Sequence, residues 1–299
     1  MKTQRQLADA DLSGFDLSGF DLSGANLNHA DLSGCNLTEA DLSSADLCDA
    51  NLSRSNLTSA NLCSAQLSST NLRGAVLSGA NLSDADLLDI DLSHGDLARA
   101  ILNGAKLREV DLSSTLMSDA YLVQADLCLA NLANSDLTNS NLTKAELEGA
   151  NLSFASLKNS NLTQANLSDA DMSHIDLADA DLSKAILTDA NLTGALLTNA
   201  ILVRAECDRV DMSFAALSGA DLTQTRLTDS DLRHADFSRC NLTKANLSGA
   251  DLSESNLSLS NLSKANLSGA NLRSANLDGA ILDDARLTGA TMPDGSIHS

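Results

Sequence analysis

The fold of this chain is decided by residues 25–49, which read ANLNH-ADLSG-CNLTE-ADLSS-ADLCD. Each block of five begins with a small residue, continues with Asp or Asn and then Leu, and usually places Ser or Thr fourth. The Leu position returns at every fifth residue from 7 to 292, and 52 of these 58 positions hold Leu. The others are also apolar: Met117, Met172, Cys207, Met212, Phe237 and Met292. One five-residue repeat therefore accounts for nearly the whole chain.

A period of five is incompatible with a simple helix or strand. Five residues advance an α-helix by roughly 140°, so the leucines would spiral around it without forming a stripe. In a continuous strand, an odd period would point successive leucines to opposite faces. The leucines share one core only if the chain turns once per repeat. We therefore expect stacked coils about 4.8 Å apart, with the small residue and Leu inside and the other three residues outside.

The position before each Leu, here called the Asx slot, has a structural role. It holds 20 Asp and 20 Asn. Both side chains accept hydrogen bonds from the backbone two residues further on and so support turns. Equal use of a charged residue and its neutral counterpart indicates that the slot selects shape more than charge.

The repeat resembles that of the pentapeptide-repeat family over nearly the whole chain. The resemblance implies an all-β fold, a right-handed quadrilateral parallel β-helix with four repeats per coil, about 14.5 coils and a rod of roughly 70 Å. The expected organisation is an N-terminal extension at 1–4, a single β-solenoid over 5–292 and a C-terminal tail at 293–299. The tail breaks the period with Pro293-Asp294-Gly295, and the segment MPDGSIH resembles the tails of cyanobacterial members.

Composition points away from catalysis. Aromatic residues are 2% of the chain, Trp is absent, and the net charge of −21 argues against direct nucleic-acid binding. No two of the five His are twenty residues apart, and the six Cys contain no CxxC pair, so we expect no metal site. No nucleophile elbow or phosphate-binding loop occurs. We expect no enzyme, cofactor, small-molecule substrate or membrane span, and a cytoplasmic location.

Counting four repeats per coil predicts neighbours twenty residues apart. His174 should pack near Phe154, and His234 near Phe214, on the outer surface. Cys35 and Cys240 in the small-residue slot, and Cys207 in the Leu slot, should be buried. Phe15 and Phe20 hold the small-residue slot in the first coil, where large rings could close the N-terminal mouth, since terminal repeats of solenoids are usually atypical.

A candidate binding surface is marked by apolar residues in the Asx slot. There are nine: Val76, Ile101, Leu116, Tyr121, Ile186, Leu196, Ile201, Ala216 and Ile281. We expect a binding stripe made of two clusters four to five coils apart. The first apolar cluster is Ile101, Leu116, Tyr121 and Val123, and the second is Ile186, Leu196, Ile201 and Val203. Two interpretations remain open at this point, drift of the repeat and a surface for a protein partner or self-association.

Two functions follow from these observations. The first is a non-catalytic scaffold that binds a protein partner through the flat faces of an acidic rod. The alternative, implied by resemblance to members that protect DNA gyrase, is a DNA-mimicking binder of a topoisomerase. The charge is uneven for a DNA mimic, because residues 51–80 contain no acid and carry +2. The loops and the C-terminal dimerisation element of the resistance-type relatives also have no counterpart in the repeat.

Overall fold

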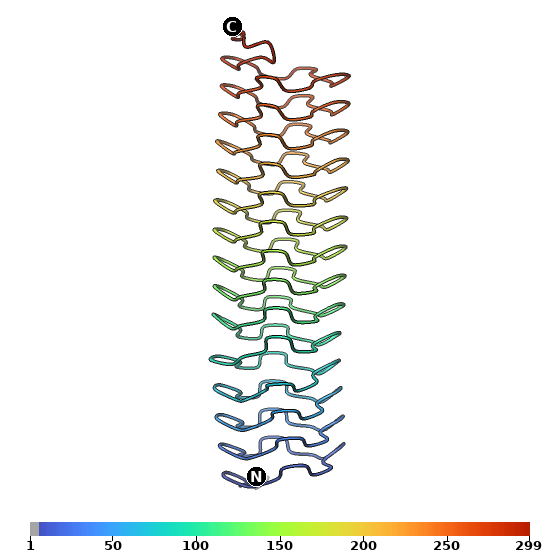
Figure 1. Ribbon diagram of the computed structural model, residues 1–299, viewed down its shortest axis with the longest axis vertical. Helices are drawn as coiled ribbons and strands as arrows, with labels where there is room; N and C mark the ends of the chain where they lie inside the picture. The colour runs from blue at the N-terminus through green and yellow to red at the C-terminus, as the bar shows by residue number, and fades with distance from the viewer. Residues whose placement is uncertain (1–5) are drawn as a thin grey trace. The chain divides into compact units, whose positions relative to one another are not determined.

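The computed structural model describes residues 6–299, and in this range the backbone turns once per repeat and contains no helix (Figure 1). The strands are single-residue bridges at every fifth position from 6 to 291, with one more at 297. Most of these positions form a parallel bridge with the residue twenty positions further on, as in Asp11↔Asp31 and Asp31↔Asn51. Four repeats therefore make one coil. The predicted fold class, a right-handed quadrilateral parallel β-helix, is confirmed.

The chain divides into two compact units, Met1–Glu146 and Leu147–Ser299. The twenty-residue bridge register is the same inside each unit. The single β-solenoid over 5–292 stays a prediction, and the extension predicted at 1–4 lies outside the described residues.

The regular repeat uses three hydrogen bonds, one to the next coil and two within its own turn, as the repeat at 31–35 shows. The Leu32 amide donates to the Asn51 carbonyl of the next coil at 2.7 Å, and the Cys35 amide donates back to the Leu32 carbonyl at 3.2 Å. The Ser33 amide donates to Oδ1 of Asp31 at 2.9 Å. The turn requires a positive φ at the residue before the small slot, where Gly34 has φ +65°. The predicted backbone role of the Asx slot is confirmed.

The core of each unit consists of the Leu and small-residue slots. From Leu22 to Ala270 nearly all of these side chains are less than 5% exposed. Burying one Leu contributes about 2 kcal/mol, an upper value that conformational entropy largely offsets. The predicted burial of Cys35, Cys207 and Cys240 is confirmed. Where Ser occupies the small slot, its hydroxyl often donates to the carbonyl three residues earlier, as Ser55 Oγ does to the Leu52 carbonyl at 2.7 Å.

The C-terminal tail folds back on the last repeats. After the turn at 293–295, Ile297 forms an antiparallel bridge with Thr291. The His298 amide donates to the Ala290 carbonyl and the Gly289 amide donates to the His298 carbonyl, both at 2.8 Å. The tail thereby pairs backbone groups that the final repeat would otherwise present to solvent.

Candidate functional site

The first apolar cluster lies on two neighbouring faces of the first unit. Ile101 and Tyr121 form a bridge with each other and so share one face, and Leu116 lies on the face before it. Leu116 is 53% exposed and Tyr121 is 51% exposed, whereas Ile101 and Val123 are half-buried. The Leu102 amide donates to the Tyr121 carbonyl at 2.6 Å, so the backbone at this position keeps the regular ladder. The cluster therefore exposes apolar side chains on a part of the β-solenoid whose backbone hydrogen bonds are regular.

The second apolar cluster lies in the second unit and is spread over three faces. Leu196 bridges to Ala216, and Ile201 lies on the following face, where it bridges to Asp181 and Asp221. Ile186 is on the face after that and bridges to Glu206. Leu196, Ile201 and Ile186 are exposed, and Val203 is half-buried. These side chains therefore lie on three successive faces of the coil and do not form a single flat patch. The stripe made of both clusters stays a prediction.

Most acids in the Asx slot are engaged by their own turns. Oδ1 of Asp11 accepts hydrogen bonds from the Ser13 hydroxyl at 2.7 Å and from the Ser13 amide at 3.1 Å. These hydrogen bonds hold the pKa of the Asp11 carboxyl below its ordinary value. Asn side chains extend the pattern between coils, because Asn51 Nδ2 donates to Oδ1 of Asp31 at 3.0 Å. The acidic surface is therefore in large part a set of turn caps.

Two aromatic–imidazole pairs lie on the outer surface of the second unit. The rings of Phe154 and His174 stack with centroids 5.0 Å apart, and those of Phe214 and His234 with centroids 4.7 Å apart. The predicted packing of both pairs is confirmed. Sequence reasoning missed Leu129 and Leu259, which occupy the same turn position of other repeats and are also exposed. Their signal was present in the repeat register, which places that position outside.

The bridge ladder is interrupted on one face of the first unit. No bridge joins Asn71 to Asp91 among the described residues, although Asn51↔Asn71 and Asp91↔Asp111 are regular. In the same part of the chain, the amides of Leu72 and Gly74 lack the bonds to the Asp91 and Ser93 carbonyls that the register predicts. We call this interruption, between 71–74 and 91–94, the ladder gap.

The residues in the small-residue slots explain the ladder gap. Ile90 is flanked at twenty residues by Thr70 and Val110, so three β-branched side chains stack where most coils have Ala. Side chains larger than Ala at these closely packed positions push neighbouring coils apart and shift the backbone. Gly95 occupies the next small slot, and a Cβ on it would lie 2.8 Å from the Leu92 carbonyl oxygen, so the backbone here is too tight for Ala.

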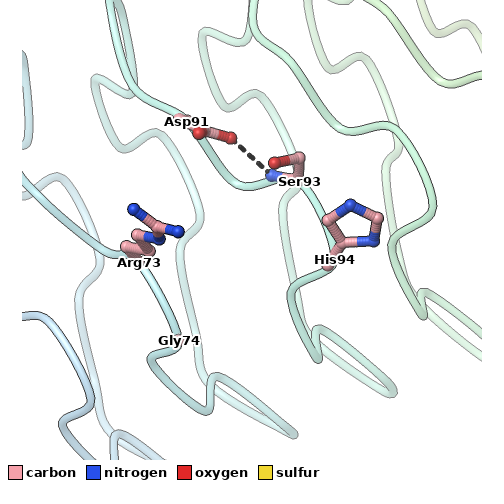
Figure 2. Close-up of a pocket in the computed structure, with 5 residues that line it drawn as sticks. All are labelled: Arg73, Gly74, Asp91, Ser93 and His94. Atoms are coloured by element: carbon pink, nitrogen blue, oxygen red, sulfur yellow. Dashed lines mark hydrogen bonds between the residues drawn. The ribbon is translucent and has the colours of Figure 1, made fainter.

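A pocket opens at the ladder gap. It has a volume of about 470 Å³ and is lined by Arg73, Gly74, Asp91, Ser93 and His94. Figure 2 shows Arg73 and Gly74 on one coil and the other three residues on the next. The Ser93 amide donates to Asp91 Oδ1 at 2.9 Å. Hydrogen bonding by the Ser93 hydroxyl and amide holds the pKa of the Asp91 carboxyl below its ordinary value, and the charges of Arg73 and His94 lower this pKa further.

A second depression adjoins this pocket. Its volume is about 420 Å³, and its lining adds Ser53, Arg54 and Asn71 to the shared Arg73 and Gly74. Residues 51–80 contain no acid, but the repeat pattern alone predicted no site there. The signal that could have located the pocket is the run of β-branched residues at twenty-residue spacing.

No group of three His, Cys, Asp or Glu side chains in 6–299 is arranged to hold a metal ion. All six cysteines are free. Burial raises the pKa of the Cys240 thiol to about 12 and that of Cys207 further, so both remain protonated thiols near neutral pH. Within the same residues no helix has the length and apolar character that crossing a membrane would require.

The predicted N-terminal cap residues lie in the first described coil. Phe15 and Phe20 are 56% and 51% exposed, and their carbonyls accept the amides of Asn36 and Asp41. Their role as a cap stays a proposal. If it holds, Phe15→Ala combined with Phe20→Ala should accelerate amide hydrogen exchange in residues 10–50, because the first leucines lose their cover. Exchange rates equal to those of the wild type would refute it.

The chain is similar to a family whose model is described as pentapeptide repeats, which matches overlapping segments from 6–43 to 255–292. Among solved structures, HetL from the cyanobacterium Nostoc sp. strain PCC 7120 is a pentapeptide repeat protein involved in heterocyst differentiation regulation. It is 34% identical over 85% of this chain and 92% of that chain, with a TM-score of 0.32.

Two further solved structures are similar to the chain. Rfr23, from the cyanobacterium Cyanothece 51142, is 34% identical over 36% of this chain and 63% of its own, with a TM-score of 0.17. QnrB1, a plasmid-mediated fluoroquinolone resistance protein, is 20% identical over 65% of this chain and 92% of its own, with a TM-score of 0.40. No curated protein matches the chain.

Proposed function

Because the chain belongs to the pentapeptide-repeat family over residues 6–292, we propose that it is a non-catalytic scaffold that binds a protein partner, or a second copy of itself, through the faces of its coils. The observation that carries the proposal is the first apolar cluster. Leu116 and Tyr121 are each more than half exposed in slots where most repeats carry Asp or Asn. Exposed apolar groups gathered on a polar surface are typical of protein interfaces, and Tyr is enriched among the residues that dominate binding.

The acidic surface supports this proposal better than mimicry of DNA. A DNA mimic needs a continuous array of outward carboxylates. Asn replaces Asp in half of the Asx-filled slots, and residues 51–80 contain no acid. Binding to a topoisomerase is therefore the alternative outcome of the test.

The test compares two kinds of variant in partner capture from the native host and in a gyrase supercoiling assay. Asp171→Asn combined with Asp211→Asn removes charge while keeping the hydrogen-bonding shape of the slot. We expect this variant to capture the same partner as the wild type, and neither protein to inhibit supercoiling. Inhibition of supercoiling that the acid-neutralised variant loses would replace the scaffold proposal with the mimic.

A further inference from the structure

The ladder gap leaves hydrogen-bonding groups of the backbone unused. One coil below it, the Leu52 amide donates to the Asn71 carbonyl at 2.8 Å and the Arg54 amide donates to the Arg73 carbonyl at 3.0 Å. In the part of the chain that the structure describes, the equivalent amides of Leu72 and Gly74 have no such partner. Gly74 lines the pocket, so its amide is a free donor for an anion, and the Leu72 amide lies two residues away.

The charges around the gap match these donors. Arg54 and Arg73 are the ionised residues of the segment 51–80, which contains no acid. Neither takes part in the ion pairs found among residues 6–299. Arg73 and His94 line the pocket from neighbouring coils, and Arg54 lines the adjoining depression. A guanidinium presents a planar fork that fits carboxylate and phosphate oxygens, so Arg54 and Arg73 favour an oxyanion, and the Asp91 carboxylate offsets only part of this positive charge.

The pocket also contains acceptors. The Asp91 carboxylate lines it, and in the described structure the carbonyls of Asp91 and Ser93 lack the amide partners that other coils provide. These oxygens would repel a bare polyanion but would accept hydrogen bonds from hydroxyl or amine groups. A volume of about 470 Å³ lies within the usual range for small-molecule sites.

We propose that the ladder gap binds a small polar molecule that carries an oxyanion, a carboxylate or a phosphate group, together with hydrogen-bond donors. The oxyanion lies against Arg73, Arg54 and the amide of Gly74. The donors of the ligand face the Asp91 side of the pocket. The molecule is a bound ligand and not a substrate, and the site is independent of the partner-binding surface proposed above.

The experiment is a titration of the full chain, ¹⁵N-labelled, with glycerol phosphate in one arm and glycerate in the other, since each combines an oxyanion with hydroxyl donors. The amide resonances of Leu72 and Gly74 report on the gap, and those of Leu52 and Arg54 report on the paired ladder below it. We expect saturable shifts confined to the gap. The anion that saturates at the lower concentration shows whether the natural ligand carries a phosphate or a carboxylate.

Arg54→Gln combined with Arg73→Gln should weaken binding by at least about tenfold, because two charge-assisted contacts are lost. Arg99→Gln is the matched control, since Arg99 is exposed in the same unit and lies outside the pocket. The control should bind like the wild type. Absence of saturable shifts with both anions would overturn the proposal, as would equal affinities of the double variant and the control.

Discussion

Replacing both Leu116 and Tyr121 by Asp is expected to abolish partner binding while leaving the far-UV circular dichroism spectrum unchanged. Both side chains are more than half exposed, so their removal leaves no cavity in the core. Asp is also common in this slot, where it accepts the amide two residues further on. Two charges placed on an apolar contact should cost at least about 2 kcal/mol each, a combined loss of roughly a thousandfold in affinity.

The control for this pair is Leu129→Asp. Leu129 is 50% exposed in the same unit, at a turn position outside the first apolar cluster. It should bind the partner as the wild type does, and the comparison separates a local contact from a general loss of surface hydrophobicity. If the double variant bound every partner of the wild type with unchanged affinity, the apolar residues in the Asx slot would be drift of the repeat.

Phe237→Ala is expected to lower the free energy of unfolding by about 3–5 kcal/mol. Phe237 occupies a Leu slot, is fully buried and is the largest buried side chain of the core. Its amide donates to the Asn256 carbonyl at 2.7 Å, so the backbone is fixed and cannot collapse freely into the space left by the ring. Denaturant titration followed by circular dichroism measures the change.

Phe214→Ala provides a matched comparison within the same unit. Phe214 is 63% exposed and loses only its stack on His234, so we expect a change below about 1 kcal/mol. Equal effects of the two substitutions would contradict the assignment of an inside and an outside to the repeat. A larger effect at Phe214 would contradict it more strongly.

The sequence predicted the local structure because the same five-residue pattern repeats without interruption from 7 to 292. Leu at every fifth residue requires one turn per repeat, and the Asx residues show how the turn is supported. The number of repeats per coil could not be obtained from the period and came from the family resemblance. With that number, simple counting placed Phe154 on His174 and Phe214 on His234, and both stacks are present.

The ladder gap and the folded tail were harder to predict, for different reasons. Thr70, Ile90 and Val110 are each acceptable in a small slot by themselves, and only their stacking at twenty-residue spacing overfills the wall. Ile175 shows the contrast, since it has Ala155 and Ala195 as neighbours and the bridges around it are regular. The tail turns where Pro293 and Gly295 indicate, but its antiparallel pairing with the last repeat depends on tertiary geometry.

The central claim, that apolar residues in the Asx slot contact the partner, is tested most directly by site-specific photo-crosslinking. A photoreactive amino acid replaces Leu116, Tyr121 or Asp111 in separate full-length proteins. Asp111 lies on a face of the first unit where every described Asx slot from 11 to 131 holds Asp or Asn. The account predicts crosslinks to the partner, or to a second copy, from positions 116 and 121 and none from 111. Crosslinks from 111 with none from 116 or 121 would contradict it.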